Sequence, residues 1–344
     1  MPQIITRIAD DLHYSSTKEL SWQQELANVV TCPKELLSLV NIDEEKYRAH
    51  FAARKLFPVR VPRPFIKKMQ QGNFNDPLLQ QVMPLSAEQQ AVPGFIADPL
   101  EEHDTVAEGL LHKYKHRVLM IVKSGCAVNC RYCFRRHFPY EDNSPNKLRW
   151  QSALNYITEH VEINEVIFSG GDPLMAKDEH LAWLLAQLQQ IEHIKRVRIH
   201  TRLPVVIPQR ITAELVNTLS QGRLQVVMVF HINHPNEIDQ SFELAIQPLR
   251  DKRIALFNQS VLLKNINDDS EILCALSERL FSMGILPYYL HLLDPVAGAA
   301  HFDVDVHAAT KIANNMMATL PGFLMPKLVQ EIAGETNKTP INLS

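Results

Sequence analysis

The sequence contains few cysteines, no long apolar runs and no large excess of positive or negative charge. Its 344 residues include five cysteines, and 35 Lys and Arg stand against 38 Asp and Glu. This near balance of charge speaks against a nucleic-acid-binding surface or a polybasic membrane patch. No apolar run approaches the roughly 20 residues of a membrane-spanning helix, and the N-terminus lacks the apolar core of a signal peptide. We therefore expect a cytoplasmic protein that binds neither nucleic acid nor membrane.

The bulk composition excludes further classes of protein. Apolar residues make up 46 % of the chain and charged residues 21 %, which is ordinary for a globular protein and unlike a disordered, collagen-like or low-complexity chain. A chain of this length buries roughly three quarters of its unfolded surface, so it needs no disulfide bonds for stability. We expect one large globular domain or two medium ones.

Two regions of different pattern follow one another along the chain. Residues 1–115 contain helical patterns, a proline-rich segment and an extended arm over 74–102, and no convincing strand pattern precedes Val118. Beyond this region, short β-branched segments alternate with amphipathic helical segments. The expected strands are 117–123, 165–170, 196–201, 224–232, 254–263 and 286–293.

This alternation predicts the architecture. From the second strand onward, strands begin every 28 to 32 residues, and such repeats build parallel sheets with right-handed crossovers. Six units favour an α/β fold built as a partial (β/α)6 barrel with a helical N-terminal extension, and a doubly wound sheet is the alternative. We expect the extension over 1–115, the barrel over 116–330 and a C-terminal segment over 331–344. In either topology, ligands bind at the carboxyl ends of the strands.

Three of the five cysteines lie within eight residues, directly after the first expected strand. The spacing Cys126-x3-Cys130-x2-Cys133 suits three irons of a cubane cluster, because iron–sulfur clusters are held by cysteine thiolates. The fourth iron would then bind a small molecule. The alternative is a structural zinc site with His137 as its fourth ligand, although such sites favour two CxxC pairs and the sequence has no second pair. The spacing therefore favours the cluster.

The cysteine motif at the end of the first barrel strand resembles that of the radical S-adenosylmethionine superfamily. There, the open iron of a 4Fe-4S cluster binds S-adenosylmethionine, and an electron from the cluster cleaves it to a 5′-deoxyadenosyl radical. The second expected strand ends in Ser169, Gly170, Gly171 and Asp172, which look like the family's glycine-rich motif for the methionine amino group. Glycines at a strand end also let the backbone approach a ligand closely.

The resemblance is closest to the lysine 2,3-aminomutase family, whose members also use pyridoxal phosphate, and it extends from about Phe74 to Lys338. Seven ordered segments carry it: HKYKHRVLMIVKSGCAVNCRYCFRRHF, VIFSGGDPL, HTRLPVVIPQRIT, HINHPNEI, NQSVLLKNIND, PYYLHLLDPVAGAAHF and PGFLMPKLVQEIAGETNKTP. It implies an isomerase, an intramolecular aminotransferase that shifts the amino group of L-lysine between adjacent carbons.

Cofactor-binding residues follow from this resemblance, position by position. Lys338 matches the lysine that carries pyridoxal phosphate. Tyr114 and Arg117 match positions near that cofactor, and arginine suits a phosphate because its guanidinium donates two parallel hydrogen bonds. His231 and Gln259, at the ends of the fourth and fifth strands, match contacts of S-adenosylmethionine.

Three further residues match substrate-binding positions of the family. Arg135 corresponds to the residue that pairs with the α-carboxylate, while Asp294 and Glu331 correspond to carboxylates that hold the ε-ammonium. In the family the second carboxylate is Asp, and a glycine-rich run precedes the lysine that carries pyridoxal phosphate, whereas residues 333–337 here read AGETN. We expect the longer Glu331 side chain to shift how the substrate sits.

The chain ends six residues after Lys338, and this short form resembles the branch of the family that makes (R)-β-lysine for modification of translation elongation factor P. The resemblance implies L-lysine as substrate, a reductase or flavodoxin-type electron donor, and a functional link to elongation factor P and its lysyl-ligating enzyme. Three alternatives stay open. They are a radical aminomutase for another amino acid such as glutamate or arginine, radical chemistry without pyridoxal phosphate, and a non-catalytic zinc-binding module.

Overall fold

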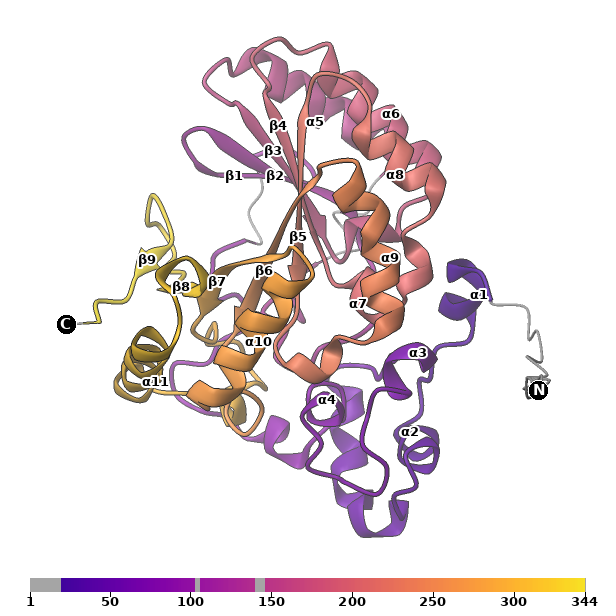
Figure 1. Ribbon diagram of the computed structural model, residues 1–344, viewed down its shortest axis with the longest axis vertical. Coiled ribbons are helices and arrows are strands. Elements are labelled where there is room, and N and C mark those ends of the chain that lie inside the picture. The colour runs from indigo at the N-terminus through magenta and orange to yellow at the C-terminus, as the bar shows by residue number, and fades with distance from the viewer. Residues whose placement is uncertain (1–19, 103–105, 140–145, 344) are drawn as a thin grey trace, which may run out of the picture.

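The computed structural model describes residues 20–102, 106–139 and 146–343. Its centre is one sheet of nine strands whose order in space follows their order in the chain (Figure 1). The strands are β1 (Leu110–Tyr114), β2 (Arg117–Lys123), β3 (Glu165–Gly170), β4 (Arg196–Thr201), β5 (Gln225–His231), β6 (Ala255–Val261), β7 (Leu286–His291), β8 (Lys327–Gln330) and β9 (Thr339–Pro340). Strands β2 to β8 run parallel, and β1 and β9 pair antiparallel at the two edges.

The strand order confirms the partial barrel and excludes the doubly wound alternative, in which the order reverses part-way through the sheet. The two edge strands, β1 and β9, are not neighbours in this sheet, so the barrel is open. All six expected strands are present, and β8 continues the parallel series beyond them.

The prediction that no strand precedes Val118 is wrong, because β1 forms a hairpin with β2 in which Tyr114 lies opposite Arg117. The sequence of β1, LLHKY, has no alternation of apolar and polar residues. Pairing with the neighbouring strand, rather than a pattern in its own side chains, makes this segment a strand.

Helices cover the outer face of the sheet, where α5, α6, α8 and α9 follow one another (Figure 1). The helices that accompany the strands are α5 (Lys147–Glu159), α6 (Asp178–Gln189), α7 (Leu203–Val206), α8 (Ala213–Ser220), α9 (Gln240–Asp251), α10 (Ser270–Ser282) and α11 (Val306–Thr319). Helix α9 shows why they form: the Asp239 carboxylate caps the first turn, and Phe242, Ile246 and Leu249 recur with helical period on the buried face. No helix within the described ranges has the length and apolar character needed to cross a bilayer.

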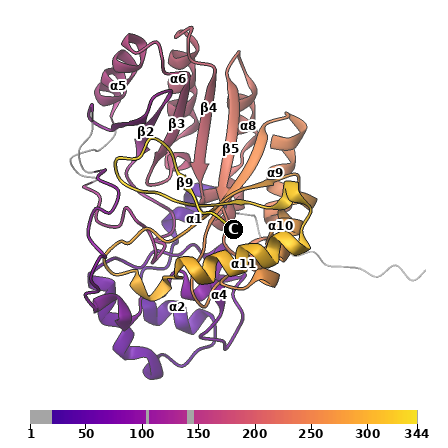
Figure 2. The same cartoon turned by 90° about the vertical axis from the view of Figure 1, so that its left-hand side faces the viewer.

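The N-terminal extension packs under one end of the sheet, as both views show (Figures 1 and 2). It contains α1 (Trp22–Ala27), α2 (Pro33–Leu39), the 3-10 helix Glu44–Lys55, α3 (Arg63–Ile66), α4 (Pro77–Gln80) and the 3-10 helix Ser86–Gln89. Its Leu36 and Phe65 belong to the same buried cluster as Phe168 and Met228 of the barrel. The extension therefore shares the main hydrophobic core and closes the end of the barrel at which the strands finish.

Candidate active site

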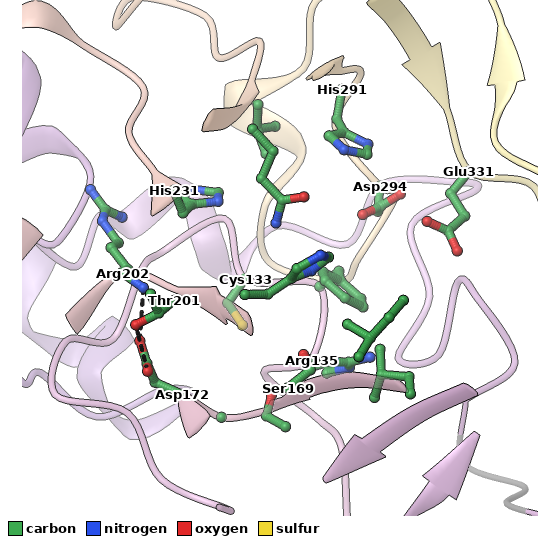
Figure 3. Close-up of a pocket in the computed structure, with 18 of the residues that line it drawn as sticks. Cys133, Arg135, Ser169, Asp172, Thr201, Arg202, His231, His291, Asp294 and Glu331 are labelled. Atoms are coloured by element: carbon green, nitrogen blue, oxygen red, sulfur yellow. Dashed lines mark hydrogen bonds between the residues drawn. The ribbon is translucent and has the colours of Figure 1, made fainter. Parts of the chain in front are cut away.

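The carboxyl ends of the parallel strands surround a cavity of about 270 Å³. All the site residues expected from the sequence line it: Tyr114, Arg117, Cys126, Cys130, Cys133, Arg135, Ser169, Gly170, Gly171, Asp172, His231, Gln259, Asp294, Glu331 and Lys338. Figure 3 shows Cys133, His231, Asp294 and Glu331 around this space. The structure thus brings together residues that lie as far apart in the sequence as Tyr114 and Lys338, while their individual roles stay predictions.

Three thiols of the loop that follows β2 line one wall of the cavity. The loop is held in a turn in which the Cys133 N–H donates to the Cys130 carbonyl oxygen at 3.0 Å. Burial and the neighbouring thiols raise the pKa of Cys133 to about 11, and burial raises the pKa of Cys126 as well. Because thiolates rather than thiols ligate metals, iron binding at this loop must release protons.

The arrangement fits a multi-iron cluster better than a single metal ion. Within the ranges that the structure describes, no three His, Cys, Asp or Glu side chains converge on one ion, as zinc with ligands at about 2.0–2.3 Å requires. His137, the fourth ligand in the zinc alternative, is exposed, and its Nε2 lies 3.2 Å from the Ala297 carbonyl oxygen. Three thiols that line one cavity wall without meeting at a point suit a cluster that takes one thiolate per iron.

A buried arginine that the sequence analysis did not single out supports the cysteine loop. Arg202 donates to Cys130 Sγ at 2.7 Å and to Glu237 Oε2 at 2.8 Å. Burial disfavours the cation, but Cys130 and Glu237 outweigh it and raise the pKa of Arg202, so the guanidinium stays charged. Arg202 also donates to the Tyr132 hydroxyl, which lies 2.9 Å from His231 Nε2. A fixed positive charge therefore lies beside one of the expected cluster ligands.

The two glycines after β3 allow two loops to touch. A Cβ atom on Gly171 would lie 2.5 Å from the Gly125 carbonyl oxygen, and one on Gly170 would lie 2.4 Å from the Lys123 carbonyl oxygen. The Gly171 N–H donates to the same Lys123 oxygen at 2.7 Å. These glycines therefore permit the glycine-rich loop to lie close to the start of the cysteine loop.

Asp172 links the end of β3 to the end of β4 by hydrogen bonds. Its carboxylate accepts hydrogen bonds from Thr201 Oγ1 at 2.8 Å, from the Arg202 N–H at 2.8 Å and from the Leu203 N–H at 2.9 Å (Figure 3). Both carboxylate oxygens thus bind groups of the protein at the end of β4. This bonding fits a positioning role for Asp172, with the glycine-rich loop held in place over the cysteine loop.

A chain of charged side chains runs along the cavity from Arg135, beside the glycine-rich loop, to Lys338. Arg135 Nε donates to Glu102 Oε2 at 2.6 Å, and Lys113 Nζ lies 3.0 Å from Glu102 Oε1 and 3.8 Å from Glu331 Oε1. Lys338 Nζ pairs with the other oxygen of Glu331. Burial opposes ionisation of Glu102, but Arg135 and Lys113 lower its pKa. Neither Glu102 nor Lys113 was predicted, since isolated charged residues outside a motif give no local signal.

Asp294 differs from these paired groups. Burial and the nearby Glu331 raise its pKa to about 7, against the opposing effect of Lys338. In the part of the chain that the structure describes, no protein group donates a hydrogen bond to its carboxylate, whose neighbours at the cavity include His291 (Figure 3). Burial lowers the pKa of His291 and of His200, so both imidazoles are neutral at pH 7. Asp294 is thus a half-buried acceptor at the cavity, suited to a cationic ligand.

Comparison with known proteins identifies the family. Residues 120–270 match the model of the radical SAM superfamily. The chain is 55 % identical over 323 residues to the L-lysine 2,3-aminomutase of Escherichia coli (strain K12), covering 94 % of each chain. The chain belongs to the lysine 2,3-aminomutase family. It is also 56 % identical to the Haemophilus influenzae L-lysine 2,3-aminomutase, over 94 % of this chain and 96 % of that one.

A more distant member of the lysine 2,3-aminomutase family, from Clostridium subterminale, is 33 % identical over 93 % of this chain and 77 % of its own length. Membership of the family makes the protein an isomerase of the aminomutase type. It also implies a 4Fe-4S cluster and S-adenosylmethionine, as in other radical S-adenosylmethionine enzymes.

Proposed function

We propose that this aminomutase converts L-lysine to (R)-β-lysine, with pyridoxal phosphate carried on Lys338. The observation that carries the proposal is the distribution of charge in one cavity. Arg135 lies near the glycine-rich loop, with its Nη1 3.1 Å from Ser169 Oγ, and Asp294 and Glu331 lie together on another wall (Figure 3). A ligand with a carboxylate at one end and an ammonium at the other complements this arrangement, and lysine is such a molecule.

Each side chain then has a role in holding lysine. Arg135, oriented by its ion pair with Glu102, binds the α-carboxylate. Asp294 and Glu331 bind the ε-ammonium, and the half-buried position of Asp294 strengthens its attraction to a cation. This grip places the α-amine and Cβ of lysine between the cysteine loop and Lys338. Positioning of this kind, with water excluded, is the contribution of the protein to cofactor-dependent chemistry.

The residues around Lys338 fit pyridoxal phosphate. The Lys338 amine points into the cavity, where it pairs with Glu331 and lies 6.0 Å from the centre of the Tyr289 ring. Arg117 stacks on the Tyr114 ring at 4.0 Å, and its guanidinium suits the phosphate. When bound, pyridoxal phosphate supplies a conjugated system that stabilises an unpaired electron beside the migrating nitrogen.

The cysteine loop fits the cluster in the same way. Cys126, Cys130 and Cys133 would hold three irons, and the charged Arg202 beside Cys130 Sγ would stabilise the added electron of the reduced cluster. Ser169, Gly170, Gly171, His231 and Gln259 lie around the remaining space, where S-adenosylmethionine would bind. Asp172, which accepts hydrogen bonds from Thr201 and Arg202, holds the glycine-rich loop in position.

The biological role in this proposal is modification of elongation factor P. The resemblance to the branch of the family that makes (R)-β-lysine for this modification supports it. In this role the enzyme acts in the cytoplasm and receives electrons from a reductase or a flavodoxin-type donor. It also has a functional link to the enzyme that ligates β-lysine to elongation factor P.

A product assay tests the proposed reaction. Anaerobically reconstituted enzyme is incubated with S-adenosylmethionine, dithionite and either L-lysine, L-arginine or L-glutamate, and the products are resolved on a chiral column. We expect (R)-β-lysine from lysine and no turnover of glutamate, and a Cys126/Cys130/Cys133 triple Ala variant to be inactive. Preferred turnover of another amino acid would refute the substrate assignment.

Borohydride trapping tests the pyridoxal phosphate assignment separately. Reduction of the holoenzyme followed by peptide mapping should place the pyridoxyl group on Lys338 and should give none in Lys338→Ala. Lys327→Ala, an exposed lysine on the neighbouring strand β8, serves as the matched control and should label normally. A pyridoxyl group on another lysine of the unaltered enzyme would show that Lys338 is not the carrier.

A further inference from the structure

A groove on the surface of the N-terminal extension lies behind the cysteine loop. It has a volume of about 460 Å³, and its lining includes Arg54, Lys55, Arg60 and Asn129; we refer to it as the basic groove. Arg54 and Lys55 end the 3-10 helix Glu44–Lys55 and are exposed. The neighbouring Leu56 is 48 % exposed, so an apolar side chain borders the charged rim, as in many protein-binding surfaces.

One residue of the cysteine loop, Asn129, lines the basic groove. The Asn129 N–H donates to the Arg60 carbonyl oxygen at 3.0 Å, and Asn129 Nδ2 donates to the Pro58 carbonyl oxygen at 2.9 Å. Arg131 Nη1 donates to the Phe57 carbonyl oxygen at 2.7 Å. Asn129 and Arg131 flank Cys130 in the sequence. A short stretch of hydrogen-bonded backbone therefore separates the groove from a thiol that lines the cavity.

The cations of the basic groove have no partners of opposite charge. Among the described residues, no carboxylate forms an ion pair with Arg54, Lys55 or Arg60, whereas nearby Arg63 pairs with Glu35 at 2.6 Å. The chain as a whole carries a formal charge of −3, so this local excess of positive charge runs against its average. Unpaired cations around an apolar residue favour an acidic partner, because complementary charge steers association.

We propose that the basic groove docks a small acidic electron-carrier protein, which reduces the cluster from the outer side of the cysteine loop. The proposal rests on the proposed ligation of the cluster by Cys126, Cys130 and Cys133. S-adenosylmethionine and lysine would fill the inner side of the loop, so the outer side is the short route for an electron. One electron leaves the reduced carrier and one enters the cluster, with no bond made or broken in the step.

Charge reversal at the groove tests the proposal. The variant Arg54→Glu/Lys55→Glu is compared with Lys195→Glu/Lys252→Glu, two exposed lysines that precede β4 and β6 and so lie at the far end of the barrel. The rate at which the enzyme becomes active, read from the onset of β-lysine formation, is measured against the concentration of reduced flavodoxin at low salt, and separately with dithionite. We expect the groove variant to raise the KM for flavodoxin at least tenfold, the control to stay within twofold, and the dithionite rates to be equal.

The outcomes separate the docking proposal from the proposed function. An unchanged KM for flavodoxin in the groove variant would overturn the docking proposal while leaving the function intact. If the dithionite rate of that variant also fell, the milder variant Arg54→Gln/Lys55→Gln is measured in the same way. We expect it to raise the KM for flavodoxin while its dithionite rate stays unchanged. Any other result for this variant would overturn docking at the basic groove. Unaltered enzyme that takes up no iron and sulfide on anaerobic reconstitution would instead refute the cluster assignment on which both rest.

Discussion

Asp294 is the residue on which the binding of a cationic substrate should depend most. It is half-buried at the cavity, no protein group in the described ranges donates to its carboxylate, and loss of solvent together with Glu331 raises its pKa to about 7. Glu331, in contrast, already pairs with Lys338. The ammonium of lysine would therefore stabilise the charged form of Asp294 and leave Glu331 shared between the substrate and Lys338.

We expect Asp294→Asn to weaken lysine binding by about 2–5 kcal/mol, the usual cost of removing one partner of a buried charge pair. Because 1.4 kcal/mol is about a tenfold change, the KM for lysine should rise at least about 30-fold. Steady-state kinetics with lysine measures this effect. Asp251→Asn, an exposed position at the end of α9, is the control and should leave the KM unchanged. A normal KM in Asp294→Asn would exclude the role.

The raised pKa of Asp294 also predicts a pH dependence. Above pH 7 the carboxylate is charged and attracts the ammonium, whereas below pH 7 it takes up a proton and loses that attraction. The kcat/KM for lysine should therefore fall as the pH drops through about 7, by up to tenfold per unit. Asp294→Asn should lack this limb of the profile. An unaltered enzyme with constant kcat/KM between pH 8 and 6 would contradict the assignment.

At the scale of elements, the sequence predicts the parallel strands well and the edge strands poorly. The bounds of β2, β3 and β4 agree with the expected segments, because β2 and β3 contain continuous apolar runs and β4 alternates apolar with polar residues. The edge strands β1 and β9, and β8 beside β9, escaped prediction because they are short and owe their conformation to pairing with a neighbour. The site residues of known motifs gather because parallel strands end at one edge.

The partners of those site residues could not be predicted in the same way. Arg202 lies 72 positions from the Cys130 sulfur to which it donates, and Glu102 lies 33 positions from Arg135. Ordinary charged residues have no local pattern that indicates such distant partners. The resemblance to a family indicated the expected ligand residues. The residues that hold them in place, such as Arg202 and Glu102, could be recognised only in the structure.

The contact between the glycine-rich loop and the cysteine loop gives a prediction for these elements. Gly171→Ala places a methyl group 2.5 Å from the Gly125 carbonyl oxygen, so the two loops must separate, at a cost of about 1–3 kcal/mol. We expect a lower Tm and reduced iron per chain after reconstitution. Gly322→Ala, where nothing lies within 4 Å of the added carbon, should retain normal iron. Full iron content in Gly171→Ala would argue against this packing.

At the scale of the whole molecule, Glu88 fastens the extension to the barrel. Its Oε2 lies 2.6 Å from Arg131 Nη2 and 2.8 Å from Arg136 Nη2, and all three side chains are fully buried. Both arginines belong to the cysteine loop. The extension thus holds the loop from outside while Asp172 and Arg202 hold it from inside the barrel.

Glu88→Gln should leave two buried guanidinium groups without their carboxylate, which costs about 3–5 kcal/mol. We expect a clear fall in Tm and poor retention of iron. Glu35→Gln removes the partner of Arg63 in an ion pair at the surface and should cost no more than about 1 kcal/mol. Equal Tm values for the two variants in thermal unfolding would show that Glu88 is not such an anchor.

The proposed reaction depends on formation of the radical in the same cavity that holds the amino acid. Its most direct test uses S-adenosylmethionine that carries deuterium on the 5′ carbon, incubated anaerobically with the enzyme, lysine and dithionite, and mass spectrometry of the isolated β-lysine. Deuterium should pass into β-lysine, because a 5′ carbon that had taken a hydrogen from lysine would return one to the product. β-Lysine formed without deuterium would contradict the proposed reaction.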